Sequence, residues 1–235
     1  MPVSERSARA RRTPRYASAI VTGASSGIGA AFARALAREG TALVLVARRA
    51  ERLQSLAREL TFAHGVDVEP LPLDLARAEA TAALAARIDA RPPELLVNNA
   101  GFACYGAFAD LPVGPQLAVV DVNVRALVAL SHTFVRAARA RGHGALVQVA
   151  STAGYAPMPY EAVYAASKGF VIHFGEALWE ELRGTGVRVL TLCPGFTETE
   201  FAGVAGLPPK VVLQRSEEHT SELQSLRASR MPSSA

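Results

Sequence analysis

Short apolar runs alternate with longer amphipathic segments along most of this chain, and the alternation restricts the possible folds. The runs are rich in Val, Leu and Ile with little polar alternation, which is typical of strands buried on both faces. They are ASAIVTG (17–23), ALVLVAR (42–48), VDVEPLPLD (66–74), ELLVNN (94–99), GALVQVAS (144–151) and VRVLTLCPG (187–195). Segments of helical periodicity separate them, at 27–39, 50–63, 76–90, 113–141 and 161–184. This order predicts one α/β domain with a doubly wound parallel sheet and right-handed crossovers.

The positive charge of the chain is concentrated at its N-terminus. The formal net charge is +4, and residues 1–18 supply all of it. The residues responsible are Arg6, Arg9, Arg11, Arg12 and Arg15, against Glu5. The near-neutral remainder argues against a nucleic-acid-binding domain. We expect residues 1–16 to form a disordered basic arm; a membrane or nucleic-acid anchor and a transit peptide are the alternatives.

Hydropathy, cysteine and histidine patterns argue against several other classes of protein. There is no unbroken run of 18 apolar residues, so we expect no membrane span. Cys104 and Cys193 show no C-x-x-C spacing, which favours a reducing, cytoplasmic location over a disulfide framework. The five histidines show no metal-ligand spacing, and we expect no metal site.

A glycine-rich segment, TGASSGIG (22–29), follows the first predicted strand and opens the first predicted helix. Gly23, Gly27 and Gly29 allow a close backbone approach, and the free N–H groups of the helix attract a pyrophosphate. The hydroxyls of Ser25 and Ser26 add possible donors. A tight strand-to-helix turn with no ligand is the alternative interpretation.

Six motifs, in order, resemble those of the short-chain dehydrogenase/reductase family, in its small single-domain branch. The resemblance runs from about residue 17 to about residue 214. The motifs are TGASSGIG (22–29), NNAG (98–101), Asn123, Ser151, the Y-x-x-x-K pair Tyr164 and Lys168, and the pair Pro194 and Gly195. The resemblance implies a Rossmann-type domain that transfers a hydride between NADP(H) and a carbonyl or secondary alcohol.

The end of the second strand indicates which dinucleotide is used. NAD enzymes usually carry an acidic residue there, whereas this chain has Arg48 followed by Arg49. Arg48 could bind a 2′-phosphate, so we expect NADP(H) rather than NAD(H); two solvated arginines are the alternative. The resemblance implies further cofactor contacts from Ile28, Asp74, Leu75, Asn98, Asn99, Ala100, Gly101, Tyr164, Lys168, Pro194, Gly195, Thr197 and Thr199.

Tyr164 is the expected general acid and base. The unperturbed pKa of a tyrosine is about 10, and one cation about 4 Å away can lower it by the amount that catalysis needs. Lys168 lies four residues along the same predicted helix, so both side chains share a face. Ser151 ends a strand, where it can hydrogen-bond the substrate oxygen. The resemblance implies that Asn123 lies in a distorted helix and holds a water linked to Lys168. Each of these residues alone also fits an ordinary structural role.

The C-terminal segment does not continue the α/β pattern. Residues 215–225 (RSEEHTSELQS) and 229–235 (SRMPSSA) resemble a translated sequencing-library adapter. We therefore expect a domain at 17–214 that is incomplete after its sixth strand, and a non-native tail at 215–235. Strand 187–193 would then be an exposed edge. The resemblance implies that the parent enzyme is a homodimer or homotetramer that uses helices 113–141 and 161–184.

Two further functional hypotheses belong to other classes. A non-catalytic NADP(H)-binding protein, for instance a redox sensor, would keep the glycine turn without needing Ser151, Tyr164 and Lys168. A nucleic-acid binder would depend on the basic arm. For the enzyme, the segments FACYGAF (102–108) and GYAPMPY (154–160) predict an apolar substrate pocket. Tyr155 and Tyr160 either line this pocket or have an ordinary packing role.

Overall fold

Six parallel strands form one sheet at the centre of the computed structural model, which describes residues 14–196, 203 and 205–206. The strand order is β3-β2-β1-β4-β5-β6. The strands are β1 (Ser18–Thr22), β2 (Ala42–Ala47), β3 (Val68–Pro72), β4 (Leu95–Asn98), β5 (Gly144–Val149) and β6 (Val187–Leu192). The predicted doubly wound parallel sheet is confirmed, and each strand lies within its predicted apolar run.

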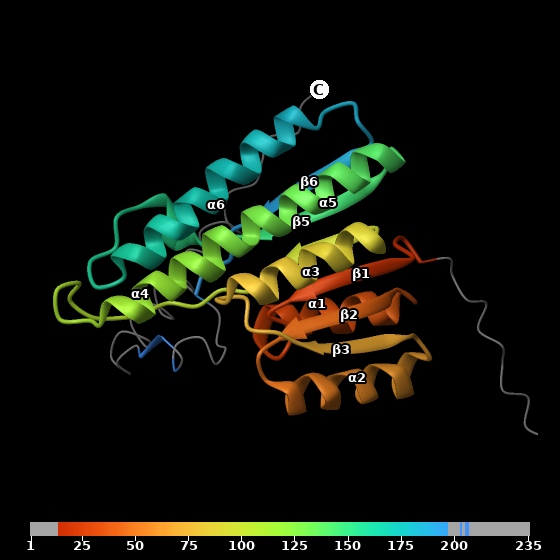
Figure 1. Ribbon diagram of the computed structural model, residues 1–235, viewed down its shortest axis with the longest axis horizontal. Coiled ribbons are helices and arrows are strands. Elements are labelled where there is room, and N and C mark those ends of the chain that lie inside the picture. Colours follow the sequence, from red (N-terminus) through yellow and green to blue (C-terminus); the bar gives the residue numbers. More distant parts are fainter. Residues whose placement is uncertain (1–13, 197–202, 204, 207–235) are drawn as a thin grey trace, which may run out of the picture.

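Helices cover both faces of this sheet. On one face lie α3 (Ala78–Ala90), α5 (Leu127–Arg141) and α6 (Ala162–Glu181), which Figure 1 shows side by side. The opposite face carries α1 (Gly27–Arg38) and α2 (Ala50–His64). Two further elements extend this set, α4 (Val113–Val120) and the short 3-10 helix η2 (Thr152–Tyr155). A π-helical segment, η1 (Asp121–Ala126), joins α4 to α5 without a break.

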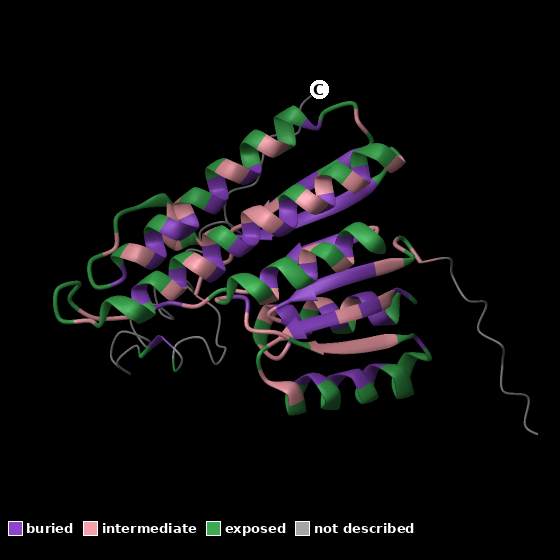
Figure 2. Ribbon diagram, in the orientation of Figure 1, coloured by how far each residue is buried: buried purple, intermediate pink, exposed green. Residues whose placement is uncertain are grey.

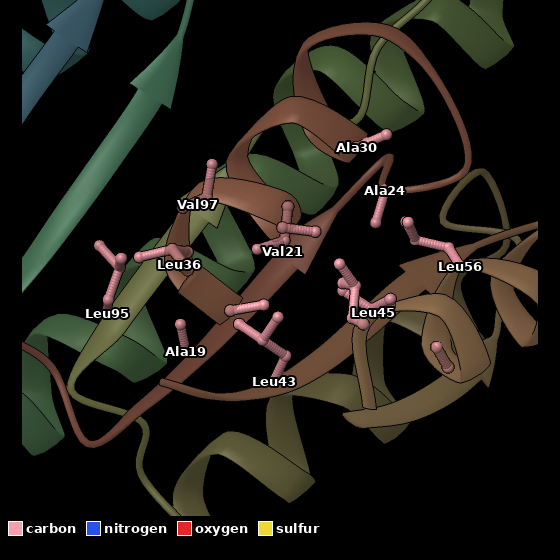
Figure 3. Packing of buried hydrophobic residues seen from close by; sticks show 14 of the residues in the cluster. Ala19, Val21, Ala24, Ala30, Leu36, Leu43, Leu45, Leu56, Leu95 and Val97 are labelled. Atoms are coloured by element: carbon pink, nitrogen blue, oxygen red, sulfur yellow. The ribbon is translucent and has the colours of Figure 1, made fainter. Parts of the chain in front are cut away.

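Alternate residues of each strand point to opposite faces, so the sheet has two apolar cores. Ala19 and Val21 of β1 lie in the core beneath α1 and α2, together with Leu43 and Leu45 of β2. Figure 3 shows this cluster from close by. Ile20 points the other way, into the core beneath α3 and α5. The central strands β1, β4 and β5 are accordingly almost fully buried, whereas the edge strand β3, pink in Figure 2, is only partly buried.

One helix passes a simple test for a membrane span. Val113–Arg141, which comprises α4, η1 and α5, is long and apolar enough to cross a membrane, judged by length and composition alone. The sequence predicts no membrane span, because the chain has no unbroken run of 18 apolar residues, and so does not anticipate such a helix. Leu127, Leu130 and Phe134 of this helix are buried, however, and α5 packs on β5 and α3. The core helix of a folded domain has the same composition.

Strand β6 is an edge strand in the described part of the chain, where it pairs only with β5. Val187 and Val189 are buried beneath the helices of one face. Arg188 and Leu190 point to the other face, where Leu190 is 56% exposed. The expected non-native tail at 215–235 and residues 1–13 of the expected basic arm (1–16) lie outside the described residues, so both expectations stay predictions; of the described residues 14–16, Tyr16 packs against the core beneath α1 and α2.

Candidate active site

The strand order reverses between β1 and β4, and ligands of such sheets bind beyond the carboxyl ends of the strands at this point. A cavity of about 770 Å³ lies there. Residues that follow all six strands contribute to its wall, including most of the glycine turn, the last three residues of NNAG (Asn99, Ala100 and Gly101), Ser151 and Gly195. The volume lies within the range of small-molecule and cofactor sites.

The glycine turn brings the start of α1 to this cavity. Gly23 and Gly27 adopt left-handed φ angles of 66° and 53°, which favour glycine. Any Cβ at Gly29 would overlap the carbonyl of Gly23, so this position also requires glycine. Helix α1 begins at Gly27 without a side-chain cap, and Ser25, Ser26 and Ile28 line the cavity. The N-terminus of α1 can therefore face an anion. Of the three glycines, Gly29 packs behind the cavity rather than lining it.

Thr22 joins the glycine turn to the end of β4. Its hydroxyl donates to the carbonyl of Val97 at 3.2 Å and accepts from the N–H groups of Asn99 and Ala100, both at 3.0 Å. The side-chain amide of Asn99 donates in return to the Thr22 carbonyl at 2.9 Å. These bonds hold Asn99, Ala100 and Gly101 at the cavity wall.

Asn98 points away from the cavity. Its amide donates to Ser131 Oγ at 2.9 Å and to Gln148 Oε1 at 3.2 Å, and Gln148 donates to Ser131 Oγ at 2.8 Å. All three side chains are buried. Asn98 therefore belongs to a polar network between β4, β5 and α5 and is not among the residues that line the cavity, and its expected cofactor contact stays a prediction.

Arg49 is a cavity residue that the sequence interpretation did not select. It donates through Nη2 to Ser26 Oγ at 2.7 Å and to Ser25 Oγ at 3.0 Å. Arg48 lines the same cavity, with its guanidinium 5.9 Å from the centroid of the Phe102 ring. Both arginines lie at the carboxyl end of β2, so a phosphate there could contact either one.

Other predicted cofactor residues have mixed outcomes. Asp74 and Leu75 line the cavity after β3, and the Asp74 carboxylate accepts from the Ala76 N–H at 3.2 Å. Pro194 and Gly195 line it after β6. The last two positions, Thr197 and Thr199, lie outside the described residues.

The structure brings Ser151, Tyr164 and Lys168 to one cavity. Ser151 follows β5, and its Oγ accepts from the Ala153 N–H at 3.2 Å. Tyr164 and Lys168 lie on α6 and are only 7% and 5% exposed. Lys168 Nζ lies 5.8 Å from the centroid of the Tyr164 ring and donates to the Val149 carbonyl at 2.8 Å.

Asn123 lies within the π-helical segment η1, so the helix is distorted where the resemblance implied. Its amide donates to the Phe102 carbonyl at 3.1 Å and to Ser167 Oγ at 2.9 Å, while its Oδ1 accepts from the Phe102 N–H at 3.2 Å. The side chain lies behind the cavity wall rather than in it. A Cβ at Gly101 would lie 3.0 Å from Asn123 Oδ1 and 3.3 Å from Lys168 Nζ, so this glycine lets both groups approach the loop.

Burial lowers the pKa of Lys168 from 10.5 to about 8, and Cys193 opposes this effect in part. The charged form is disfavoured because water is excluded around the ammonium group. At pH 7 the side chain is still mostly protonated, so it can act as a cation beside Tyr164.

Together, the sheet order, the glycine turn and the cavity define a dinucleotide-binding α/β protein. The sequence profile described as "short chain dehydrogenase" matches residues 17–206. The chain belongs to this family, whose members are oxidoreductases.

Named relatives agree with this assignment. An uncharacterized oxidoreductase of Myxococcus xanthus (strain DK1622) is 37% identical over 201 residues, which cover 85% of this chain and 79% of that protein. The solved short-chain dehydrogenase from Sphingobium yanoikuyae in complex with NADPH has a TM-score of 0.79 and 31% identity, covering 93% of this chain and 97% of that one. A putative NAD(P)-dependent gluconate 5-dehydrogenase from Beutenbergia cavernae with bound NADP has a TM-score of 0.77 and 34% identity, covering 87% and 80%.

The first prediction concerns the buried charge of Lys168. The unfolded chain binds a proton there more tightly than the folded chain, so burial destabilises the fold below about pH 8 and ceases to do so above 10.5. The full penalty at neutral pH is roughly 3 kcal/mol. We expect the stability of Lys168→Met relative to the original chain to fall by roughly 2–3 kcal/mol between pH 7 and pH 10. Denaturant unfolding at each pH measures this, and a constant difference would contradict the prediction.

Proposed function

We propose that this chain transfers a hydride between NADP(H) and a carbonyl compound or secondary alcohol, with Tyr164 as general acid and base. The observation that carries the proposal is the position of Ser151, Tyr164 and Lys168 on the same cavity as the glycine turn. NADP(H), when bound, supplies or accepts the hydride. The residues of the chain then have to position the substrate oxygen and handle one proton.

Tyr164 would give its proton to the substrate oxygen during reduction and take it back during oxidation. A cation close to the ring stabilises the phenolate relative to the phenol and so favours proton release. Lys168 Nζ lies 5.8 Å from the centroid of this ring. Ser151 would donate a hydrogen bond to the same substrate oxygen. This bond would hold the oxygen next to the Tyr164 hydroxyl.

Asn123 would support the return of the proton. Its hydrogen bonds to Phe102 and Ser167 hold η1 open beside Lys168. π-helical segments are frequent at functional sites, because they leave backbone groups without their usual helical partners. We propose that such a group holds a water between Lys168 and solvent, as the family resemblance implies.

The preference for NADP(H) over NAD(H) rests on the end of β2. The cavity has Arg48 and Arg49 there, and no carboxylate of the described residues replaces them. Two solved relatives contain NADPH or NADP. Arg49 is the stronger candidate for the 2′-phosphate, because its guanidinium already contacts the hydroxyls of the glycine turn.

The second prediction separates catalysis from cofactor binding. Tyr164→Phe removes the proton donor but keeps the ring, so we expect kcat for NADPH-dependent reduction of generic ketones and diketones to fall by roughly 10²–10⁴. The Kd for NADPH, measured by its fluorescence, should stay within about threefold. Tyr105→Phe is the control and should retain activity. Retained activity in Tyr164→Phe would refute the role of Tyr164. NADPH binding without turnover by the original chain would favour the non-catalytic hypothesis.

The third prediction concerns the two arginines. Loss of a charge-assisted hydrogen bond costs about 1.5–3 kcal/mol, so Arg49→Ala should weaken NADPH binding by roughly 10- to 100-fold and NADH binding much less. Arg48→Ala should have a smaller effect. Arg58→Ala, an exposed arginine on α2, is the matched control. Fluorescence titration of both dinucleotides measures the ratio; tighter binding of NADH by the original chain would contradict the assignment.

We further propose that the chain acts in the cytoplasm as a homodimer or homotetramer. An apolar groove lies between η1 and α6, lined by Val120, Val124, Val163 and Phe170, among others. Nearby on α4, Leu117 is 57% exposed. Exposed apolar surface of this kind commonly marks an interface.

The fourth prediction tests this interface. Phe170→Glu places a charge in the groove and should shift the molecular mass in solution to that of the 24.8 kDa monomer. Phe62→Glu, at a side chain 95% exposed on α2, is the control and should leave the mass unchanged. Light scattering coupled to size exclusion measures both. Equal masses for the two variants would rule out this groove as the contact.

A further inference from the structure

Tyr155 is an exposed aromatic side chain whose hydroxyl is tied to a second strand end. The ring lines the cavity and is 66% exposed. Its hydroxyl donates to Cys193 Sγ at 3.3 Å, which connects η2 to the residue that follows β6. A free exposed tyrosine could turn away into solvent, whereas this bond restricts the direction of the ring.

The backbone around this contact is fixed as well. The Thr152 N–H donates to the Pro194 carbonyl at 3.0 Å, and the Ala150 N–H donates to the Leu192 carbonyl at 2.8 Å. A Cβ at Gly154 would lie 2.6 Å from the backbone carbon of Lys168, so η2 packs directly on α6. The ring of Tyr155 is therefore held in a fixed position relative to α6 and to Ser151, the residue that precedes η2.

The cavity wall on this side is apolar. Met158 and Phe196 line it together with Tyr155. The hydrogen bond to Cys193 raises the pKa of Tyr155 above its ordinary value, so the phenol stays uncharged near neutral pH. Among the described residues of the wall, the charged side chains are Arg48, Arg49 and Asp74, which follow β2 and β3, and Lys168, which donates to Val149.

We infer that Tyr155, positioned by Cys193, determines substrate specificity by selecting carbonyl compounds with an uncharged, flat apolar substituent. This inference rests on the proposed reductase function. A flat substituent can stack on the exposed ring, which the thiol contact has already oriented, so little freedom is lost on binding. An anionic substituent against this ring would lose its hydration, and the described wall cation beside Tyr164, the Lys168 ammonium, is buried and already donates to the Val149 carbonyl.

A matched pair of substrates tests the charge preference. Methyl benzoylformate and benzoylformate share the ketone and the phenyl ring, and differ in that only the second is an anion. We expect kcat/KM of the original chain, with NADPH, to be at least about 10-fold higher for the ester. Equal or better use of benzoylformate would overturn the inference.

Three substitutions test the residues. Tyr155→Ala should lower kcat/KM for the ester roughly 10-fold, mainly through KM, with the Kd for NADPH unchanged. Tyr155→Phe and Cys193→Ala should each raise KM for the ester roughly two- to threefold, and the double variant no more than either, because both remove the same Tyr155–Cys193 contact; an effect of Cys193 on Lys168 would appear in kcat instead. Tyr160→Ala is the matched control, since Tyr160 is 55% exposed but does not line the cavity. Loss of less than twofold in Tyr155→Ala would overturn the inference.

A binding measurement keeps the inference separate from the proposed function. The ¹⁹F signal of trifluoroacetophenone should broaden in the presence of the NADP⁺-loaded chain and much less with Tyr155→Ala. Binding that depends on Tyr155 without any turnover would support the role of Tyr155 in substrate binding and refute the proposed reductase function. Turnover that is unchanged in Tyr155→Ala would support the proposed reductase function and refute the role of Tyr155 in substrate specificity.

Discussion

The ammonium group of Lys168 is buried, and a buried charge is unfavourable unless polar groups replace the water that it has lost. The Val149 carbonyl at the end of β5 accepts one of its hydrogen bonds. Gly101 leaves the space in which Asn123 Oδ1 and Lys168 Nζ approach the NNAG segment. These contacts therefore fix the position of helix α6 relative to β5, to η1 and to the segment after β4. The position of Tyr164 on the same helix follows from this requirement.

The small residues around the cavity have a related cause. A Cβ at Gly23 would lie 2.6 Å from the amide nitrogen of Asn99, and the hydroxyl of Thr22 bonds the backbone of Asn99 and Ala100. The turn after β1 and the segment after β4 are thus in direct contact at the point where the strand order reverses. Gly23 permits this close backbone approach, which a larger side chain would prevent.

Much of this architecture could be predicted from sequence, because strands buried on both faces produce apolar runs and helices between them produce a 3.6-residue period. The direction of individual side chains could not. Asn98 and Asn99 are adjacent, yet one points into the core and the other holds the turn, since the choice depends on the partners Ser131 and Gln148 from distant segments. Similarly, Arg49 and Arg48 differ only in contacts made by the folded chain, with the Ser26 hydroxyl and the Phe102 ring respectively.

The helix 113–141 shows another limit of sequence reasoning. Its periodicity predicts one regular helix, whereas the structure contains six π-helical residues, Asp121–Ala126, in its middle. Local propensity does not favour this segment, and its position coincides with the hydrogen bonds of Asn123 to Phe102 and Ser167. Contacts that form only in the folded chain therefore accompany the irregularity. From the sequence, the helix distortion at Asn123 could be predicted only through the family resemblance.

The sheet order also gives the cavity two chemically different ends. Charged side chains, Arg48, Arg49 and Asp74, follow the strands on one side of the glycine turn, β2 and β3. Aromatic and thioether side chains, among them Tyr155, Met158 and Phe196, follow β5 and β6 on the other side. A long ligand with an anionic end and an uncharged end would bind in one orientation only, because reversing it would bury phosphate against apolar groups. The order of the strands thus determines which end of such a ligand reaches Tyr164.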